Sequence, residues 1–242
     1  MNNLPYSLYR SLWSALDLLY PPECGGCGKK GACWCVQCQE QVKILNGELC
    51  EVCGLPLEKT GVCDTCRADR PRFRALRAWA VFEEPLQSAL HNLKYRRNMS
   101  MGNALAVHMA DFVQALNWPI DVIVPVPLGR KRRRERGYNQ VGMIALPLAL
   151  ALEVRYVPKG LARRKETRSQ VGLSKQERRE NVREAFQAAA GMSGKNVLVM
   201  DDVSTTGSTL SSSAEALYFS GAKDVYALTV ARALPHHGLQ HA

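Results

Sequence analysis

The stretch Val197-Leu-Val-Met-Asp-Asp-Val-Ser-Thr-Thr-Gly-Ser-Thr-Leu210 joins a continuous apolar run to two acids, a cluster of hydroxyl residues and a glycine. The apolar run predicts a buried strand over residues 196–200, and the residues from 208 to 220 predict a helix. In an open parallel sheet, ligands bind at the carboxyl ends of the strands. Asp201 and Asp202 fall at such an end, where solvent or a ligand would reach them, so the stretch predicts a binding site as well as a fold.

The segment between this strand and this helix has the composition of a phosphate-binding loop. Gly207 allows a tight turn with positive φ, so the amides of residues 204–209 can converge at the positive end of the helix. Two carboxylates close by would suit the hydroxyls of a sugar that carries the phosphate. The alternative is a capped helix beside two exposed acids. The residues predicted to bind the sugar and its phosphate are Asp201, Asp202, Ser204, Thr205, Thr206, Gly207, Ser208 and Thr209.

The chain around this stretch alternates between strand and helix patterns. Strands are expected at 75–82, 121–126, 154–157, 196–200 and 224–231, and helices at 85–95, 102–116, 139–152, 174–186 and 208–220. This alternation predicts an α/β fold with a mostly parallel sheet and helices on both faces.

The cysteines predict a separate metal-binding module before that fold. All nine lie between positions 24 and 66, and eight form four C-x-x-C pairs. Two such pairs supply the four thiolates of one structural zinc site, so four pairs predict two zinc ions. Sequential pairing closes the shorter loops, although a crossed arrangement and an iron–sulfur cluster are alternatives. The expected ligands are Cys24, Cys27, Cys35 and Cys38 for one site, and Cys50, Cys53, Cys63 and Cys66 for the other, which leaves Cys33 as an apolar filler or free thiol.

These patterns divide the chain into an N-terminal amphipathic helix (1–22), a double zinc ribbon (23–70), an α/β domain (71–234) and a disordered tail (235–242). The N-terminal helix packs on its own protein or docks on a membrane surface or partner. It has no cleavage site and is too short to span a bilayer. We therefore expect a cytoplasmic protein without a membrane span.

Charge is distributed unevenly between these parts. Residues 1–70 hold 7 Lys and Arg against 8 Asp and Glu, whereas residues 71–242 hold 25 against 14. A basic α/β domain attracts polyanions such as phosphorylated metabolites, nucleic acid or anionic lipid.

Three further stretches, together with the Asp-Asp loop, carry a family resemblance. The Asp-Asp loop resembles the signature of type I phosphoribosyltransferases, and three others accompany it in order along the chain: Leu93-Lys94-Tyr95, Pro125 to Arg130 continuing through Arg136-Gly-Tyr-Asn-Gln140, and 161–186. Together with the four C-x-x-C pairs, they resemble the ComF/GntX family of competence-associated, phosphoribosyltransferase-like proteins.

This resemblance implies a type I phosphoribosyltransferase fold that binds phosphoribosyl pyrophosphate with Mg²⁺. Asp201 and Asp202 would hold the ribose hydroxyls, and the loop after them the 5-phosphate. Lys94 and Arg136 are further candidates for phosphate contacts. The loop expected to receive the pyrophosphate consists of Pro127, Leu128, Gly129 and Arg130.

The resemblance also implies a role in natural transformation and in the use of DNA as a nutrient, at incoming single-stranded DNA. If the site is catalytic, the reaction is phosphoribosyl transfer, and no residue identifies the acceptor. The rival hypothesis is a non-catalytic nucleic-acid-binding or adaptor module, for example one that binds a competence helicase. Residues 130–136 and 159–183 could form a basic track for DNA. Tyr138 and Tyr156 are the only aromatics near that track in the sequence, so base stacking is not expected.

Overall fold

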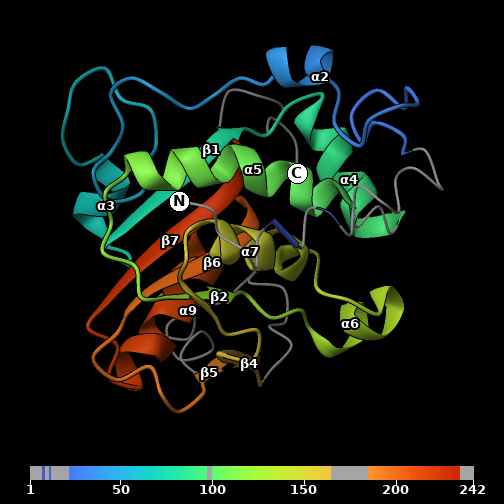
Figure 1. Cartoon of the computed structure of the whole chain (residues 1–242). Helices are drawn as coiled ribbons and strands as arrows, with labels where there is room; N and C mark the ends of the chain where they lie inside the picture. Colours follow the sequence, from blue (N-terminus) through green and yellow to red (C-terminus); the bar gives the residue numbers. More distant parts are fainter. Residues whose placement is uncertain (1–6, 9–10, 12–21, 97–99, 165–184, 235–242) are drawn as a thin grey trace.

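The computed structural model describes residues 7–8, 11, 22–96, 100–164 and 185–234 (Figure 1). Its centre is a five-stranded sheet in which every neighbouring pair of strands is parallel. The expected mostly parallel sheet is therefore confirmed. In spatial order the strands are β1 (Ala75–Val81), β7 (Asp224–Arg232), β6 (Asn196–Ser204), β2 (Val122–Pro125) and β3 (Arg155–Tyr156).

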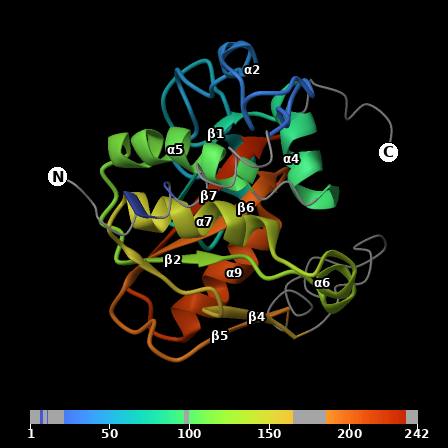
Figure 2. The ribbon, with the colours of Figure 1, turned by 45° about the vertical axis from the view of Figure 1, so that its right-hand side comes forward.

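Helices cover both faces of the sheet, as Figures 1 and 2 show. The four helices are α4 (Leu86–Tyr95), α5 (Ser100–Ala115), α7 (Gln140–Ala151) and α9 (Ser208–Phe219). Alternate residues of β6 face opposite cores: Leu198 and Met200 pack with α4, α5 and α7, whereas Val197 and Val199 pack with α9. This two-sided burial explains why the strand is a continuous apolar run in the sequence.

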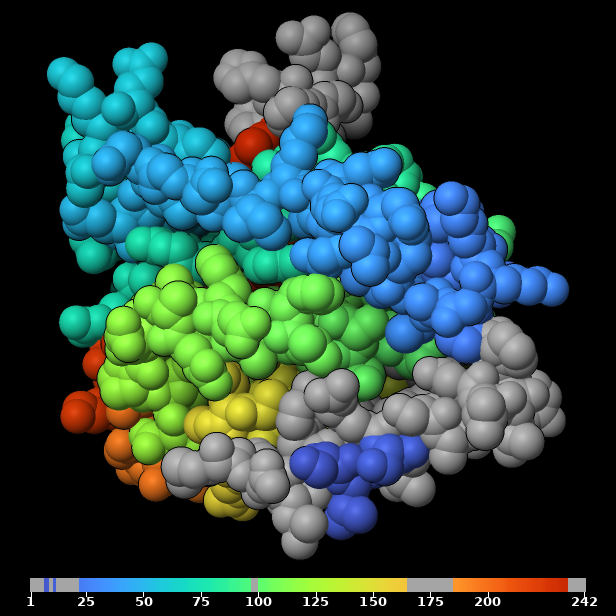
Figure 3. All heavy atoms as spheres, turned by 45° about the horizontal axis from the view of Figure 1, so that its top comes forward, coloured from blue at the N-terminus to red at the C-terminus, as the bar shows by residue number. Residues whose placement is uncertain are grey.

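The cysteine module lies at the β1 border of this sheet. In Figure 3 its blue surface adjoins the green surface that includes α5. Its two short helices, α2 (Val36–Glu40) and α3 (Asp64–Ala68), each begin directly after a cysteine. The chain between them pairs with β1: Val81 N–H donates to the carbonyl of Lys43 at 2.8 Å, and Leu45 N–H donates to that of Trp79 at 3.1 Å. The module therefore extends the sheet beyond β1 by a short antiparallel contact.

Three details differ from the expectations. The run Arg130–Arg136, for which no helix was predicted, forms helix α6, which projects away from the sheet in Figure 2. Strand β6 continues through both acids to Ser204 instead of ending at Met200. Phe186, expected at the end of a helix, lies in the antiparallel hairpin of β4 (Leu161–Arg163) and β5 (Phe186–Ala188).

Some expectations fall on residues outside the described part of the chain. These are the tail 235–242, residues 165–184 with most of the helix expected at 174–186, and nearly all of the N-terminal helix.

Candidate functional site

The site forms where the carboxyl ends of two neighbouring strands meet. Strands β2 and β6 are in parallel register, with Pro125 opposite Met200, and Val126 N–H donates to the carbonyl of Met200 at 2.8 Å. The loop 126–129 after β2 therefore begins beside Asp201, the next residue of β6. The two sequence stretches expected to bind the two ends of one ligand thus leave the sheet side by side.

The two acids occupy different environments. Asp202 is 7% exposed, and one of its carboxylate oxygens accepts from Val203 N–H at 3.0 Å. Its other oxygen is buried and forms an ion pair with the ammonium of Lys94. Asp201 accepts from Asp202 N–H at 2.9 Å. Asp202 is therefore not the solvent-reachable acid that its position in the sequence suggests.

The pKa of Asp201 lies well above its ordinary value. Burial is the main cause, and the adjacent carboxylate of Asp202 adds to it, whereas the charge of Lys94 acts in the opposite direction. A buried carboxyl group with a raised pKa, held next to a second carboxylate, is typical of functional sites.

The loop between β6 and α9 has the backbone of the expected phosphate turn. Gly207 has φ of +76° and is the N-cap of α9, so the predicted positive φ is confirmed. The hydroxyl of Thr206 accepts from Ser208 N–H at 3.4 Å, which tightens the turn. The exposed residues of this turn are Thr205, Thr206, Ser208 and Thr209.

Ser204 does not belong with these exposed hydroxyls. Its side chain is buried, and its oxygen lies 3.2 Å from the hydroxyl oxygen of Thr229 on β7. Its expected role as a side-chain phosphate donor is therefore not supported by where its hydroxyl lies.

The loop expected to receive pyrophosphate is fastened by a residue that the sequence reasoning did not single out. Asn139 Nδ2–H donates to the carbonyl of Val126 at 3.0 Å, while Asn139 Oδ1 caps α7 by accepting from Val141 N–H at 3.1 Å. An asparagine directly before an apolar helix is an N-cap signal, and this one also fixes the preceding loop. Gly129 is the N-cap of α6, and Arg130 is exposed on its first turn.

Lys94 and Arg136 are brought to the same end of the sheet but are engaged with protein groups. Lys94 pairs with Asp202, as described. Arg136 donates to Gln140 Oε1 at 2.8 Å, and its guanidinium carbon lies 4.8 Å from the ring centre of Tyr95. The hydroxyl of Tyr138 donates to the carbonyl of Leu93, which ties the end of α4 to the segment after α6.

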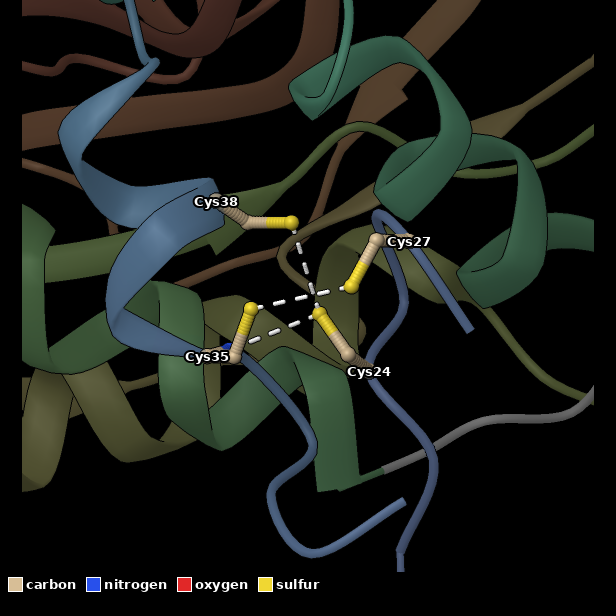
Figure 4. Close-up of side chains that lie close together, drawn as sticks. All are labelled: Cys24, Cys27, Cys35 and Cys38. Atoms are coloured by element: carbon tan, nitrogen blue, oxygen red, sulfur yellow. Dashed lines mark hydrogen bonds between the residues drawn. The ribbon is translucent and has the colours of Figure 1, made fainter. Parts of the chain in front are cut away.

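The eight paired cysteines form two groups, with the sequential pairing that loop length favours. Within each group the four sulfur atoms lie within 4.8 Å of one another. In the first group the sulfur atoms of Cys24, Cys27, Cys35 and Cys38 point toward one another from a turn and from α2 (Figure 4). Cys33 belongs to neither group.

The donor set of both groups fits zinc. Backbone N–H groups point at sulfur, from Cys35 to Cys24 at 3.4 Å and from Cys63 to Cys50 at 3.3 Å. Although burial opposes ionisation, such hydrogen bonds hold the pKa of Cys24 and of Cys50 at about 6. Thiolates are the species that bind zinc, and sites with four of them are structural.

Two arginines from the sheet contact the second cysteine group, whose four members are all buried. Arg77 donates to the carbonyl of Cys50 at 3.3 Å, and the nearly buried Arg232 donates to that of Cys53. A zinc ion with four thiolates keeps two net negative charges, so neighbouring guanidinium groups stabilise it. Arg232 also pairs in register with Ser204, at the start of the phosphate turn.

No helix in the described part of the chain is long and apolar enough to cross a membrane.

Comparison with known proteins identifies the cysteine module and finds relatives along most of the chain. A double zinc ribbon domain model matches residues 15–67. DNA utilization protein YhgH of Escherichia coli K12 is 32% identical over 77% of this chain and 85% of its own length. Competence protein F of Haemophilus influenzae is 31% identical over 82% and 90%. Competence protein ComFC of Bacillus subtilis is 27% identical over 91% and 89%.

Among solved structures, the allosteric regulatory enzyme of purine biosynthesis aligns with a TM-score of 0.39 and 22% identity, over 55% of this chain and 26% of that one. A hypoxanthine phosphoribosyltransferase from Staphylococcus aureus aligns with a TM-score of 0.33 and 14% identity, over 53% and 61%. The chain thus spans about a quarter of the first enzyme, and alignments at these TM-scores do not assign a function.

Proposed function

The chain belongs to the family of competence protein F, ComFC and the DNA utilization protein YhgH, and on this premise we propose that it binds phosphoribosyl pyrophosphate and acts in the cytoplasm on incoming single-stranded DNA. The proposed role is in natural transformation and DNA utilisation. One observation carries the ligand part: a carboxylate pair and a phosphate turn follow one another on β6, beside the loop that leaves β2.

The ligand is proposed to lie across these three features. The 5-phosphate would accept from the amides at the N-terminus of α9 and from the exposed hydroxyls of the turn. The ribose hydroxyls would donate to the carboxylates of Asp201 and Asp202. The pyrophosphate would lie against loop 127–129 and Arg130, whose guanidinium can grip phosphate in a bidentate way.

Magnesium is the metal expected with such a ligand. Hard cations prefer oxygen ligands, and the buried Asp202 oxygen that pairs with Lys94 could serve a hydrated ion or a hydroxyl once Lys94 moves away. The ion would neutralise charge on the pyrophosphate. Transfer of the phosphoribosyl group is the reaction that this arrangement would support, with the arginine and the loop amides stabilising the leaving pyrophosphate.

The second candidate is a nucleic-acid-binding or adaptor module that does not transfer phosphoribose. The observation in its favour is α6, where five of the first six side chains are cationic and exposed. A competence helicase is one partner that such a module could bind. Of the basic segment 159–183, residues 165–183 lie outside the described part of the chain.

Titration calorimetry with phosphoribosyl pyrophosphate and Mg²⁺ tests the ligand part. The parent chain should bind, and the variant with Asp201→Asn and Asp202→Asn should bind at least about a hundredfold more weakly, because each charge-assisted hydrogen bond contributes about 1.5–3 kcal/mol. Asp224→Asn is the matched control, since this acid begins β7 at the opposite end of the sheet and pairs with Arg74. A folded double variant that binds as the parent does would refute the proposed site. If the double variant does not fold, Asp201→Asn alone makes the same comparison.

A further inference from the structure

Tyr95 is an exposed aromatic side chain beside the most basic element of the described chain. It is 61% exposed at the end of α4. Among the described residues, only Tyr95 and Phe219 are exposed large aromatics. Single exposed apolar residues are common on protein surfaces and need no explanation by themselves. The neighbours of Tyr95 are what distinguish it from Phe219.

Two side chains with planar, nitrogen-containing groups lie close to the Tyr95 ring. The ring of His91, one turn earlier on the same face of α4, lies 4.7 Å away between centroids. The guanidinium of Arg136 lies over the Tyr95 ring at 4.8 Å. His91 is itself exposed, so the three groups form a surface cluster of flat side chains. We call His91, Tyr95 and Arg136 the planar cluster.

Helix α6 leads directly into this cluster. It has no buried residue and reads Arg-Lys-Arg-Arg-Arg-Glu-Arg from 130 to 136, so that its last arginine is a member of the planar cluster. Its C-terminal end is anchored, because Arg136 donates to Gln140 and the hydroxyl of Tyr138 donates to the carbonyl of Leu93 on α4. The row of cations therefore ends at a fixed point beside an exposed aromatic ring.

We propose that the planar cluster and α6 form a binding surface for single-stranded nucleic acid, with a base stacked on Tyr95 and the phosphates along α6. The pattern matches what sequence-tolerant binding requires: cations that follow a phosphate backbone, and aromatic faces on which bases stack. Arg136 would add a cation–π contact or pair with a phosphate. Duplex DNA offers only its terminal base pairs for stacking, so the surface selects single strands.

This surface adjoins the proposed ligand site. Tyr95 follows Lys94, whose ammonium contacts Asp202, and α6 begins at the end of the loop proposed to hold pyrophosphate. Nucleic acid on the planar cluster would therefore lie beside any phosphoribosyl pyrophosphate bound at Asp201 and Asp202. The inference rests on the single-stranded DNA part of the proposed function and gives that part a location.

The test compares two single-stranded oligonucleotides of equal length, one of thymidines and one of abasic sites, by fluorescence anisotropy with the zinc-loaded full chain. Tyr95→Ala should weaken binding of the thymidine strand about fivefold or more, since stacking contributes about 1–3 kcal/mol per base. It should leave binding of the abasic strand and the slope of affinity against salt unchanged. Tyr95→Phe should bind like the parent, and so should Phe219→Ala, in which an exposed aromatic at the end of another helix is removed.

Replacing Arg132, Arg133 and Arg134 with glutamine should instead weaken both strands and flatten the salt dependence. If the parent binds the thymidine strand and Tyr95→Ala binds it equally well, stacking on Tyr95 is refuted while a DNA role elsewhere stands. If the folded parent binds neither strand, the surface and the DNA part of the proposed function both fail. Calorimetry with phosphoribosyl pyrophosphate on the same protein then shows whether the ligand part survives. Binding of a protein to this surface without binding of either strand would equally overturn the inference.

Discussion

The ammonium of Lys94 forms an ion pair with the carboxylate of Asp202 and so joins the last turn of α4 to the C-terminal part of β6. The Lys94 side chain is 21% exposed and that of Asp202 9%, so little water shields the pair. In this arrangement the lysine takes the place at the carboxylate that a sugar hydroxyl or hydrated cation would need. Ligand binding at Asp202 therefore requires the lysine to move, and its freed charge could then meet a phosphate.

Lys94→Gln should shift the pH dependence of ligand binding upward. The pKa of Asp201 is raised by burial and by Asp202, and Lys94 partly opposes that rise. Ionised carboxylates are the proposed acceptors, so binding weakens as pH falls through this raised pKa. Without the lysine charge the pKa rises further, and the midpoint of binding moves to higher pH. Calorimetry with phosphoribosyl pyrophosphate and Mg²⁺ from mildly acidic to mildly alkaline pH measures this midpoint.

Lys195→Gln, at the other end of β6, is the control. A midpoint that stays the same or falls in Lys94→Gln would contradict the proposed effect of the lysine charge.

Asp201→Asn and Asp202→Asn should change thermal stability in opposite directions. A folded-state pKa above the unfolded value means that the Asp201 carboxyl favours folding while protonated and loses that contribution as pH rises through the folded pKa. Asn at 201 should therefore raise the melting temperature at neutral pH, with a smaller gain in acid. Asn at 202 leaves a mostly buried ammonium unpaired, which should cost about 2 kcal/mol after allowance for its partial exposure. Thermal unfolding followed by circular dichroism measures the two shifts in melting temperature. Shifts of the same sign would contradict the prediction.

Gly207→Ala should weaken both the fold and the ligand site. Its φ of +76° is strained for any residue with a Cβ, which costs about 1–2 kcal/mol, and the new methyl would meet Leu76 Cδ2 at 3.3 Å. Gly191→Ala is the control, since its φ is +93° and open space surrounds the position of the added Cβ. Both variants should melt earlier, but only Gly207→Ala should bind phosphoribosyl pyrophosphate more weakly. Equal ligand affinity in the two variants would show that the turn at Gly207 is not part of the ligand site.

Metal analysis should find two zinc ions per chain, one for each group of four cysteines. Cys53→Ser should reduce the content to one, because Cys53 supplies one of four sulfur atoms in the second group. Cys33→Ser should leave two, because this residue is in neither group. Iron in place of zinc, or loss of an ion from the Cys33 variant, would show that the ligands are assigned wrongly.

Arg232→Met should accelerate release of zinc from the second cysteine group by about tenfold. Arg232 is 4% exposed and its guanidinium donates to the carbonyl of Cys53. A hydrogen bond from a charged donor contributes about 1.5–3 kcal/mol. A colorimetric chelator added to the loaded protein follows the release. Arg74→Met is the matched control, because Arg74 is an exposed arginine at the other end of the strands that pairs only with Asp224 among the described carboxylates. Equal release rates in the two variants would show that Arg232 does not stabilise zinc in the second cysteine group.

The elements that the sequence predicts well are those whose pattern is local. The apolar run of β6 is buried on both faces, the conformation of Gly207 follows from the turn, and the cysteine grouping follows from loop length. Helix α6 was missed because a run of arginines resembles a solvated loop. Arginine, lysine and glutamate are good helix formers, and Gly137, at φ +79°, ends the helix as a C-cap. Those two signals could have found it.

The contacts that the sequence could not predict join residues far apart along the chain. Lys94 meets Asp202, Tyr95 meets Arg136, and the hydroxyl of Ser204 turns to Thr229. Each contact depends on how separate elements of the chain pack against one another, and the hydrophobic periodicity of the sequence does not determine that packing. The aromatic beside the basic run was missed for the same reason, because Tyr95 is 35 residues before the first arginine of α6 in sequence and next to its last arginine in space.

The antiparallel contact between residues 43–45 and β1 has a consequence for solubility. A strand at the border of a sheet presents unpaired amides and carbonyls that can template association with another chain. At the β3 border the strand is two residues long, which limits such pairing, whereas β1 has seven residues, and the cysteine module occupies part of its free side. The module therefore shields an aggregation-prone border. Loss of the metal from this module would unfold that cover and leave the free side of β1 open to pairing with another chain.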